Sequence, residues 1–462
     1  MESKCPFHPL PDIEGKRHMN IAKNLEVSAL YFPNRPAISE DLSETSYAQL
    51  NKRANRVATA LIRKGIKPGD RVALCAPNSG DWLAFYFGVI KAGAVAVTLS
   101  SQLNKNELQL LIYHARPEFI FTFDEKLDDL FKLKNDECLK KIISPEGDMT
   151  FSQLLEGGSE NFTAIDMERT DTASILYTGG TTGIPKGVML SHENINAAIH
   201  AVIFLERSNE NDRSLCFLPF NHVFGQMHIM NATILSCGCL ELMPGFDMDR
   251  VLDCMRTGRI TKFFAVPTIF VRLLNLERLE KKLGRVRYCF SAAASLAADV
   301  VHQWKEMTGL PIHEGYGMTE AAPTVAYNHY YRHVIGSVGT EVPGVEIQIR
   351  DQNGVQMEQG QEGEICVRGP NIMKGYLNNP EETQAAFWER GWFRSGDIGI
   401  IDEDGYLYII DRLKDMIITG GENVYSLEVE EALYTYPDVQ ECAVIGAPDK
   451  EWGERVMAFI IP

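Results

Sequence analysis

Hydrophobic residues recur with two different spacings in the N-terminal part of the chain. Segments with helical spacing, SYAQLNKRANRVATALIRKG, GDWLAFYFGVIKAG and NKNELQLLIYHA, alternate with the short apolar runs RVALCA, AVAVTL and EFIFTF. A helix that connects successive buried strands is typical of βαβ units, in which helices cover a parallel sheet. The pattern from residue 19 to about residue 123 therefore predicts a mostly parallel α/β sheet.

The pattern changes along the rest of the chain. A second alternating block follows YTGGTTGIPKG and continues through FFAVPTIFVRLL and RVRYCFSA to about residue 318. After residue 336, short strand-like segments such as GEICVRG and GYLYIIDR are separated by glycine-rich turns, which predicts a small antiparallel or barrel-like subdomain. Residues 426–462 follow the order helix, strand, turn, strand, which predicts the first half of a small α/β domain.

Length and composition narrow the class of protein. The 462 residues, 45% of them hydrophobic, can fill the cores of two or more domains. The formal charge of −17 comes without a basic run, which argues against a nucleic acid partner. In such an acidic protein, isolated Lys and Arg side chains within glycine-rich motifs are the candidates for binding an anionic substrate.

Cysteines and apolar segments indicate the compartment. Ten cysteines show no repeated spacing, and neither the pair Cys237 and Cys239 nor the pair Cys5 and His8 has the partners that a metal site needs. Reduced thiols in a cytoplasmic protein are expected. The first residues, MESKCPFHPLPD, lack an apolar signal-peptide core, and Lys91 interrupts the most apolar stretch. We therefore expect neither export nor membrane insertion.

A loop rich in glycine and threonine is the strongest candidate for anion binding. Between the apolar runs ASILY and VML it contains Thr178, Gly179, Gly180, Thr181, Thr182, Gly183, Ile184, Pro185, Lys186 and Gly187. Glycines let backbone N–H groups converge on an anion, threonine hydroxyls add donors, and the lysine supplies a positive charge. The loop differs from a Walker A loop, because Gly187 follows Lys186 where that motif has Ser or Thr. It predicts a phosphate-binding site of another kind.

Five motifs occur in order over most of the chain. After the phosphate loop come HEGYGMTE at 313–320, GWFRSGDIG at 391–399, DRLKDMIITGGENVYSLEVEEAL at 411–433 and AVIGAPDKEWGE at 443–454. The set resembles the signature of the adenylate-forming superfamily, which comprises acyl- and aryl-CoA synthetases, peptide synthetase adenylation domains and firefly luciferase. The resemblance is closest to the AMP-forming acyl-CoA synthetases. It implies a ligase that uses ATP to make an acyl-adenylate from a small carboxylic acid and then transfers the acyl group to coenzyme A.

The resemblance also implies the fold class. It is an α/β fold with a large N-terminal domain of two doubly wound α/β subdomains plus a small β-barrel-like subdomain, followed by a small α/β C-terminal domain that is incomplete here. On this chain the predicted divisions are residues 1–170, residues 171–335 with the phosphate loop and the acyl pocket, residues 336–413, and a mobile domain at residues 414–462.

The resemblance assigns residues to the triphosphate. The loop from Thr178 to Lys186 would cover the β- and γ-phosphates of ATP, and Thr319 would contact the α-phosphate. Glu320 would hold Mg²⁺, which offsets the repulsion between the carboxylate substrate and the phosphates. Together with His222, these residues form the implied catalytic set: Lys186, His222, Thr319 and Glu320.

A second group is assigned to the nucleoside. Tyr316 would stack on adenine, and the flanking Gly315 and Gly317 would permit close approach of the backbone. Asp397 would accept hydrogen bonds from both ribose hydroxyls, and Arg412 would contact the same sugar.

A third group is assigned to thioester formation. Lys414 corresponds to the hinge about which the small domain rotates between two poses. The loop Gly420, Gly421, Glu422 and Asn423 resembles the one that lines the pantetheine channel in the second pose. His222, in FLPFNHVFGQ, would gate the passage between the acyl pocket and the thiol channel.

The acyl pocket is expected near residues 224–228, 265–267 and 317–322. Two departures from the family pattern concern the substrate and nucleotide pocket walls. Asn221 stands where an aromatic residue is common, and SAAASL at 291–296 replaces the commoner Gly-Gly-Ala-Pro pattern. Chain length and aromatic preference of the acid therefore stay open, as does the oligomeric state.

The sequence ends at Pro462, before the Gly-Lys motif whose lysine bridges carboxylate and phosphate in the family. We expect either a truncated sequence or a naturally short chain that is impaired in the first half-reaction. One alternative function is acyl transfer to the phosphopantetheine thiol of a carrier protein. Another is a catalytically impaired nucleotide-binding homologue. An amino-acid-activating domain is disfavoured, because LPFN lacks the aspartate that would hold an amino group, and nothing in the motifs favours a luciferase-type oxygenase.

Overall fold

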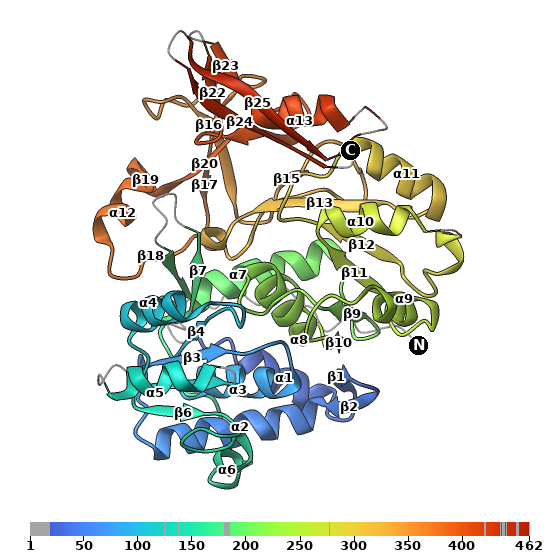
Figure 1. The fold of residues 1–462 in the computed structure, drawn as a ribbon. Coiled ribbons are helices and arrows are strands. Elements are labelled where there is room, and N and C mark those ends of the chain that lie inside the picture. The colour runs from blue at the N-terminus through green and yellow to red at the C-terminus, as the bar shows by residue number, and fades with distance from the viewer. Residues whose placement is uncertain are drawn as a thin grey trace.

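The computed structural model describes residues 19–461, apart from 124–125, 136–138, 180–184, 277, 420–421, 435, 437–438, 440 and 450–451. The chain runs from an α/β region at the bottom of Figure 1, through a second α/β region, to sheets near the C-terminus at the top. Four sheets organise these regions. The predicted mixed α/β fold class is confirmed by this architecture and by the structural comparisons given below.

The first sheet has the strand order β18-β8-β7-β4-β3-β5-β6, in which β3 to β7 are parallel. Its strands are β3 (Arg71–Cys75), β4 (Val95–Thr98), β5 (Phe119–Thr122), β6 (Lys141–Ile143), β7 (Thr172–Thr178), β8 (Lys186–Ser191) and β18 (Gly375–Tyr376). The accompanying helices are α2 (Tyr47–Arg63), α3 (Gly80–Lys91), α4 (Lys105–Ala115), α5 (Leu127–Asn135) and α6 (Phe151–Glu156). The three apolar runs of the sequence thus form β3, β4 and β5, as predicted.

The second sheet has the order β15-β14-β13-β12-β11-β9-β10-β1-β2. Its strands are β1 (Pro36–Glu40), β2 (Ser43–Ser46), β9 (Arg213–Cys216), β10 (Cys239–Leu242), β11 (Lys262–Ala265), β12 (Tyr288–Ser291), β13 (Ile312–Gly317), β14 (Thr324–Tyr327) and β15 (Thr340–Glu341). Its helices are α1 (Lys23–Tyr31), α7 (His192–Glu206), the π-helix η2 (Phe224–Asn231), α8 (Ala232–Leu235), α9 (Met248–Arg256), α10 (Pro267–Leu274), η3 (Leu279–Lys281), α11 (Ala298–Thr308) and η4 (Thr319–Ala321).

The two sheets exchange strands across the predicted division at residue 170. The hairpin β1–β2 precedes that division, yet β1 pairs with β10 of the second sheet. The hairpin β7–β8 follows it, yet β7 pairs with β4 of the first sheet. Sheet membership is set by which edge offers free backbone groups, so it does not have to follow chain order. The domain division itself stays a prediction.

Two smaller sheets form the C-terminal part. The first contains β16 (Glu346–Arg350), β17 (Gly363–Arg368), β19 (Phe387–Trp388), β20 (Trp392–Ile401) and β21 (Leu407–Arg412), with α12 (Pro380–Ala385) and η5 (Glu389–Gly391) beside it in the chain. The second contains β22 (Ile417–Thr419), β23 (Glu422–Val424), β24 (Glu441–Asp449) and β25 (Gly453–Ile461), with α13 (Ser426–Tyr434). The strand pairs in both are antiparallel, as the glycine-rich turns predicted for the first of them.

Strands β11 and β12 separate two apolar cores, because successive side chains point to opposite faces. Phe264 and Phe290 lie in the core shared with α7 and η2. Phe263 and Cys289, one residue earlier in each strand, lie in the core shared with α9, α10 and α11. The register pairs Phe264 with Phe290 and Phe263 with Cys289. Neighbouring residues of the same strand, such as Phe263 and Phe264, are therefore buried in different cores on opposite faces of one sheet.

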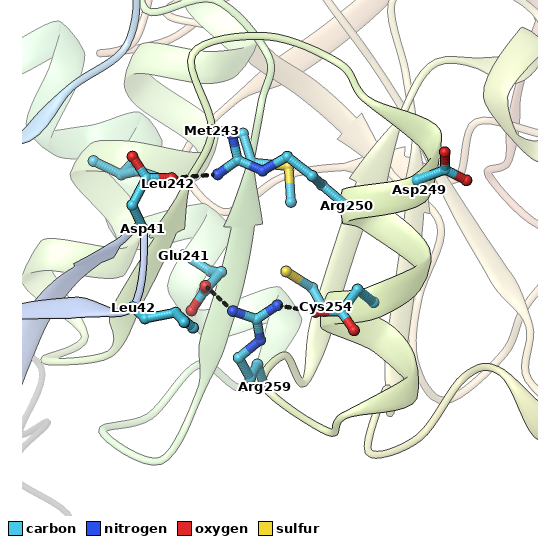
Figure 2. Close-up of a pocket in the computed structure, with 10 residues that line it drawn as sticks. Asp41, Leu42, Glu241, Leu242, Met243, Asp249, Arg250, Cys254 and Arg259 are labelled. Atoms are coloured by element: carbon cyan, nitrogen blue, oxygen red, sulfur yellow. Dashed lines mark hydrogen bonds and ion pairs between the residues drawn. The ribbon is translucent and has the colours of Figure 1, made fainter.

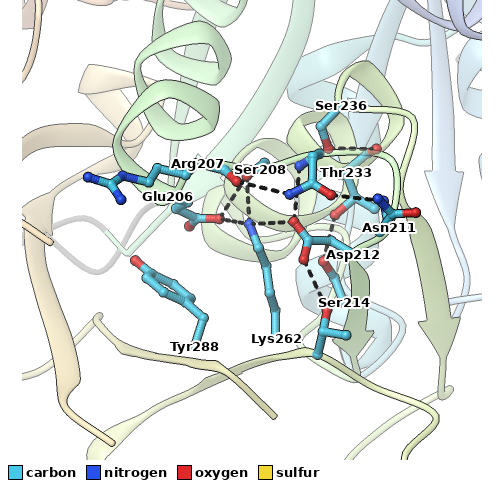
Figure 3. A network of polar contacts seen from close by, with 12 residues as sticks. Glu206, Arg207, Ser208, Asn211, Asp212, Ser214, Thr233, Ser236, Lys262 and Tyr288 are labelled. Atoms are coloured by element: carbon cyan, nitrogen blue, oxygen red, sulfur yellow. Dashed lines mark hydrogen bonds and ion pairs between the residues drawn. The ribbon is translucent and has the colours of Figure 1, made fainter. Parts of the chain in front are cut away.

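A buried ionic network lies where α7 ends and β11 begins (Figure 3). Lys262 Nζ donates to Glu206 Oε2 at 2.8 Å and to Ser208 Oγ at 2.6 Å, and His228 Nε2 lies 2.8 Å from Glu206 Oε1. Lys262 Nζ also lies 3.6 Å from an oxygen of Asp212. The four ionisable side chains of this network are 3% exposed or less, and Ser208 is also buried. The network therefore joins α7, β11 and η2 inside the molecule.

The described cysteines form no disulfide, and Cys75, Cys216, Cys237, Cys239, Cys254, Cys289 and Cys366 are buried. Burial raises the pKa of the Cys75 thiol to about 12, which keeps it protonated. Cys5 and His8 lie outside the described residues. Among the helices that the structure describes, none combines the length and the apolar character that a bilayer crossing requires.

Candidate active site

The predicted phosphate loop connects β7 with β8. Thr178 and Lys186 are register partners at the open end of this hairpin, so the loop begins and ends at one place. Gly179 is exposed, whereas Gly180, Thr181, Thr182 and Gly183 lie outside the described residues. A strand pair that opens into a glycine-rich loop leaves backbone N–H groups available for an anion.

Lys186 has two partners that the sequence did not indicate. Its Nζ lies 2.9 Å from Glu382 Oε2 of α12 and 5.1 Å from the ring centre of Tyr376 in β18. The lysine side chain is 22% exposed. The ammonium group is thus held over a ring and beside a carboxylate, with part of its surface open to a ligand.

Glu320 contacts the hydroxyl group of the same tyrosine. The Tyr376 hydroxyl donates to Glu320 Oε1 at 2.9 Å. Burial raises the pKa of Glu320, while its hydrogen bond from Tyr376 and the charge of Lys186 oppose the rise. Tyr376 therefore brings Lys186 and Glu320, which are far apart in the sequence, to one polar cluster.

Thr319 lies beside Glu320 in the short helix η4 and is buried. This segment is fixed from behind by Asn371, whose side-chain amide donates to the carbonyl oxygens of Ala321 and Thr324 at 3.0 and 2.8 Å. The Met373 N–H donates to the carbonyl of Glu320 at 2.8 Å. The segment that precedes Tyr376 therefore also positions Thr319 and Glu320.

A second polar cluster joins the three residues predicted to hold the nucleoside. The Tyr316 hydroxyl donates to Asp397 Oδ2 at 2.5 Å, and Arg412 Nε lies 3.8 Å from Asp397 Oδ1. Asp397 and Arg412 are register partners on β20 and β21. Burial raises the pKa of Asp397, and the Tyr316 hydrogen bond and the Arg412 charge oppose this. The Asp397 side chain is 18% exposed, which leaves room for a further hydrogen bond.

The glycines beside Tyr316 are required by packing. A Cβ on Gly317 would lie 1.6 Å from the carbonyl oxygen of Pro323, and one on Gly315 would lie 2.8 Å from the ring of Phe290. The backbone just before β14 and a buried ring therefore occupy the space that larger side chains would need. The tyrosine is thereby held at the end of β13.

Glu314 is a feature of this strand that the sequence analysis did not identify. It lies two residues before Tyr316, so both side chains point to the same face of β13. Its Oε2 is buried and has no hydrogen-bond partner within the described part of the chain. Burial raises the pKa of Glu314 to about 8. A charged residue inside the apolar run LPIHEGYG was the signal that could have revealed it.

This carboxyl group should make stability depend on pH. Its usual pKa is 4.5 and its folded value is about 8, so the folded protein holds the proton through that interval and becomes less stable as pH rises. We compare the free energy of unfolding of the wild type with that of the Glu314→Gln variant, whose amide does not titrate. Between about pH 5 and pH 8 the wild type should lose about 1 kcal/mol or more relative to the variant, since one pKa unit corresponds to about 1.4 kcal/mol. Thermal unfolding of both proteins across this range measures the difference, and parallel profiles would contradict it.

His222 lies at an exposed position before η2. Its Nδ1 accepts a hydrogen bond from the Phe224 N–H at 3.2 Å. Neighbouring atoms desolvate the ring and lower the pKa of His222, which favours the neutral imidazole. The side chain thus stands where the chain turns from the surface into the core.

The residues assigned to thioester formation lie at the boundary of the last sheet. Lys414 is exposed in the turn between β21 and β22. Glu422 begins β23 and is the register partner of Thr419, whereas Gly420 and Gly421 lie outside the described residues. An exposed turn between two sheets is compatible with a hinge.

Within the described residues no group of three or more His, Cys, Asp and Glu side chains could hold a metal ion. In this cluster Glu382 is paired with Lys186 and Glu320 offers one further carboxylate, so a cation there would need most of its ligands from phosphate oxygens and water. That is the coordination Mg²⁺ prefers. The residues present therefore fit a Mg²⁺ ion that arrives with a nucleotide.

A separate pocket of about 470 Å³ lies between the turn after β1, β10 and α9 (Figure 2). Its charged groups are largely paired, since Arg250 contacts Asp41 while Arg259 contacts Glu241 and Asp253. It contains none of the predicted site residues. The candidate active site is therefore elsewhere, at the two polar clusters around Tyr376 and Asp397.

Comparison with known proteins identifies the family. The model of the AMP-binding enzyme family matches residues 25–377, and that of the AMP-binding enzyme C-terminal domain matches residues 428–462. A feruloyl-CoA synthase from Amycolatopsis sp is 34% identical over 433 residues, which cover 93% of this chain and 86% of the relative. A long-chain-fatty-acid–CoA ligase from Bacillus subtilis (strain 168) is 34% identical over 471 residues, which cover 94% and 84%.

A solved structure supports the same assignment. The crystal structure of ATP-bound MatB from Rhodopseudomonas palustris superposes with a TM-score of 0.89 and 36% sequence identity, and covers 96% of this chain and 88% of that chain. ATP-dependent ligation of a carboxylic acid to coenzyme A through an acyl-adenylate, predicted from the motifs, is confirmed as the activity of this group. The chain belongs to the AMP-binding enzyme family, in the acyl-CoA synthetase branch of the adenylate-forming enzymes.

Proposed function

We propose that this protein activates a small-molecule carboxylic acid at the two polar clusters and transfers the acyl group to coenzyme A. In the first half-reaction a carboxylate oxygen attacks the α-phosphorus of ATP, the bond to the bridging oxygen breaks, and pyrophosphate leaves. In the second, the thiol sulfur attacks the acyl carbon, the thiol proton is lost, and AMP leaves. AMP is the better leaving group that a carboxylate needs before a thiol can displace it.

The cluster around Tyr376 takes the triphosphate in this proposal. Lys186 and the loop from Thr178 bind the outer phosphates, and Thr319 contacts the α-phosphate. Mg²⁺, held in part by Glu320, would neutralise charge on the phosphates. Tyr376 orients Glu320 through the hydrogen bond of 2.9 Å.

The cluster around Asp397 takes the nucleoside. Asp397 accepts hydrogen bonds from the ribose hydroxyls, Arg412 contacts the sugar, and Tyr316 stacks on adenine. Glu314 adds a group that can hydrogen-bond the base, because its buried Oε2 has no partner among the described residues and lies on the Tyr316 face of the strand. The observation that carries the proposal is the meeting of Tyr316, Asp397 and Arg412 beside a separate cluster of Lys186, Tyr376 and Glu320.

His222, Lys414 and Glu422 serve the second half-reaction. His222 separates the acyl side from the thiol side, and Lys414 is the hinge that brings the loop of Gly420, Gly421 and Glu422 to the pantetheine arm. One active site can serve two half-reactions if a hinge changes which segments line it.

The test of the proposal separates the two half-reactions. The full chain is incubated with ATP, Mg²⁺, coenzyme A and a panel of acids, and adenylates and thioesters are detected by mass spectrometry. A parallel reaction starts from synthetic acyl-adenylates and coenzyme A. Thioester formation in the parallel reaction supports the proposal. Adenylate formation without any thioester would favour a carrier-protein thiol as acceptor, and no product in either reaction would overturn the proposal.

Asp397 should matter most for nucleotide binding. In the Asp397→Asn variant the amide keeps the size of the side chain but loses its charge, and a hydrogen bond to a charged group contributes about 1.5–3 kcal/mol. We expect kcat/KM for ATP to fall by about 10- to 100-fold. Steady-state kinetics and AMP titrations measure this. The control is Asp404→Asn. The Asp404 carboxylate lies on the same hairpin, is 58% exposed and pairs with Arg332, so kcat/KM for ATP should change little in this variant. Equal losses in both variants would contradict the ribose assignment.

A further inference from the structure

Five aromatic side chains form one group that includes two residues of the predicted acyl pocket. This aromatic cluster consists of Phe224 and His228 of η2, Phe264 of β11, Phe290 of β12 and Tyr327 of β14. Each is 5% exposed or less. The cluster therefore occupies the interior between η2 and the second sheet.

The rings contact one another directly. The rings of Phe290, His228 and Tyr327 are stacked pairwise, with centroids 4.6 Å apart for Phe290 and His228, 4.9 Å for Phe290 and Tyr327, and 6.1 Å for His228 and Tyr327. Phe224 meets the edges of His228 and Phe290 at 5.2 and 5.8 Å, and Phe264 meets His228 at 5.6 Å. Ring separations of this size leave no channel between the rings for an alkyl chain.

Two rings of the cluster are close to residues of the predicted site. Phe224 lies two residues after the exposed His222, and the Phe290 ring packs on Gly315, whose added Cβ would lie 2.8 Å from it. Gly315 precedes Tyr316, and Thr319 follows three residues later. An acyl group bound with its carboxylate near Thr319 and extending past His222 would therefore soon meet Phe224 and Phe290.

The far side of the cluster is held in place by the buried ionic network. Both His228 Nε2 and the Tyr327 hydroxyl are bonded to Glu206, at 2.8 and 3.1 Å. Rotation of either ring away from the pocket would leave a buried carboxylate short of a partner, which is costly. Displacement of the His228 or Tyr327 ring to admit a longer substrate would therefore cost free energy.

The hydrogen bonds to Glu206 also affect whether a charged acyl group could bind. His228, which belongs to the cluster, and Lys262 are both bonded to Glu206. Within the described part of the chain, neither of them is free to pair with a second carboxylate on a substrate that reaches the rings. Burial of an unpaired charge is strongly unfavourable.

We propose that the acyl pocket ends at the aromatic cluster, so that the enzyme selects a short, uncharged aliphatic acid over long-chain, arylpropenoic or dicarboxylic acids. This inference rests on the proposed function, because it concerns the acid that the same site activates. Phe290 and Phe224 are its specificity-determining residues, and His228 and Tyr327 position them.

The first test compares acids under identical conditions. The full chain is given acetic, propionic, butyric, hexanoic, octanoic, palmitic, malonic and ferulic acids, and kcat/KM is measured for each acyl-CoA product. We expect propionate or butyrate to exceed octanoate and ferulate by about 10-fold or more, since methylene-sized differences in a fitted pocket give factors of that order. A preference for palmitate, ferulate or malonate would overturn the inference.

Binding gives a readout that does not need turnover. Thermal shifts are recorded with non-hydrolysable acyl-sulfamoyl adenosines that carry propionyl, octanoyl or feruloyl groups. A larger shift with the propionyl compound supports the inference even if no thioester forms. Equal shifts with all three would overturn the pocket limit while leaving adenylate binding intact, and no shift with any would overturn the proposed function as well.

Matched variants locate the limit. Phe290→Ala, and the milder Phe290→Leu, should raise the ratio of octanoate to butyrate kcat/KM by about 10-fold. Phe263→Ala is the control, because Phe263 is equally buried on the other face of the same sheet and packs on Phe217 and Phe270. It should leave the ratio unchanged. If Phe290→Ala does not fold, the ratio of octanoate to butyrate kcat/KM is measured in Phe290→Leu and in Phe224→Ala instead. An unchanged ratio in all folded variants would contradict the assignment.

Discussion

Replacing Glu320 with glutamine is expected to slow pyrophosphate release by about 10²- to 10³-fold, the usual loss when one group that stabilises developing charge is removed. The amide keeps the length of the side chain and can still accept the hydrogen bond from Tyr376, so the loss reports the missing negative charge. The carboxylate would otherwise hold a cation against the phosphates beside Lys186. The variant should also need more Mg²⁺ to reach half its maximal rate.

Two measurements check this prediction. Pyrophosphate release is followed over a range of Mg²⁺ concentrations, and thioester formation is followed from a synthetic acyl-adenylate, in which no triphosphate is present. The second rate should fall less than about 10-fold, because the metal-dependent step is bypassed. The control is Glu346→Gln, which should change neither rate. The Glu346 carboxylate is 59% exposed and pairs with Arg368. Equal losses in both half-reactions would show that Glu320 acts on folding or on the adenylate instead of the triphosphate.

Lys262→Met is expected to lower the free energy of unfolding by about 3–5 kcal/mol, the usual cost of removing one partner of a buried ion pair. Methionine has a similar length and leaves no large cavity, so the loss comes from Glu206, which would remain charged and buried. Burial alone would raise the pKa of Glu206, but Lys262 and His228 more than offset it and hold the pKa at about 2. Urea unfolding at pH 7 measures the effect.

The sign of the pH dependence gives an independent check. The pKa of Glu206 is depressed from 4.5 to about 2, so its contribution to stability is present above about pH 4.5 and is lost as pH falls toward 2. The wild type should therefore lose stability faster than Lys262→Met on acidification through this range.

A double variant and a surface variant complete the test. Adding Glu206→Gln to Lys262→Met should restore part of the loss, because the uncompensated charge is removed. Lys52→Met, at an ion pair whose lysine is 57% exposed, should change stability by about 1 kcal/mol or less. A similar loss at both lysines would contradict the assignment of the cost to buried charge.

The local features of this protein were readable from its sequence. Apolar runs of strand length and segments of helical spacing predicted β3, β4 and β5 with the helices between them, because period and length are properties of consecutive residues. The glycines and threonines from Thr178 to Gly183 predicted a phosphate loop for the same reason. The order of five motifs then gave the family and its chemistry.

The tertiary structure decided which side chains meet. Tyr376 reaches Glu320 across 56 residues, and Tyr316 reaches Asp397 across 81. No local period records such a pairing, because each partner's position is set by the register of a different strand. The exchange of β1–β2 and β7–β8 between the two sheets escaped the sequence for the same reason.

Burial was the second property that only the folded chain revealed. Glu314 and Glu206 are both glutamates in apolar surroundings, yet burial without a partner raises the pKa of the first to about 8, while Lys262 and His228 hold the second at about 2. The difference depends on neighbours brought by other elements. In the same way, the sequence placed Phe224 near an acyl pocket, but only the folded chain brings the Phe290 ring against it, and we propose that this contact limits the pocket. The sequence thus determined the fold class and the reaction, while long-range packing determined the charge state of the buried groups and which side chains meet at the site.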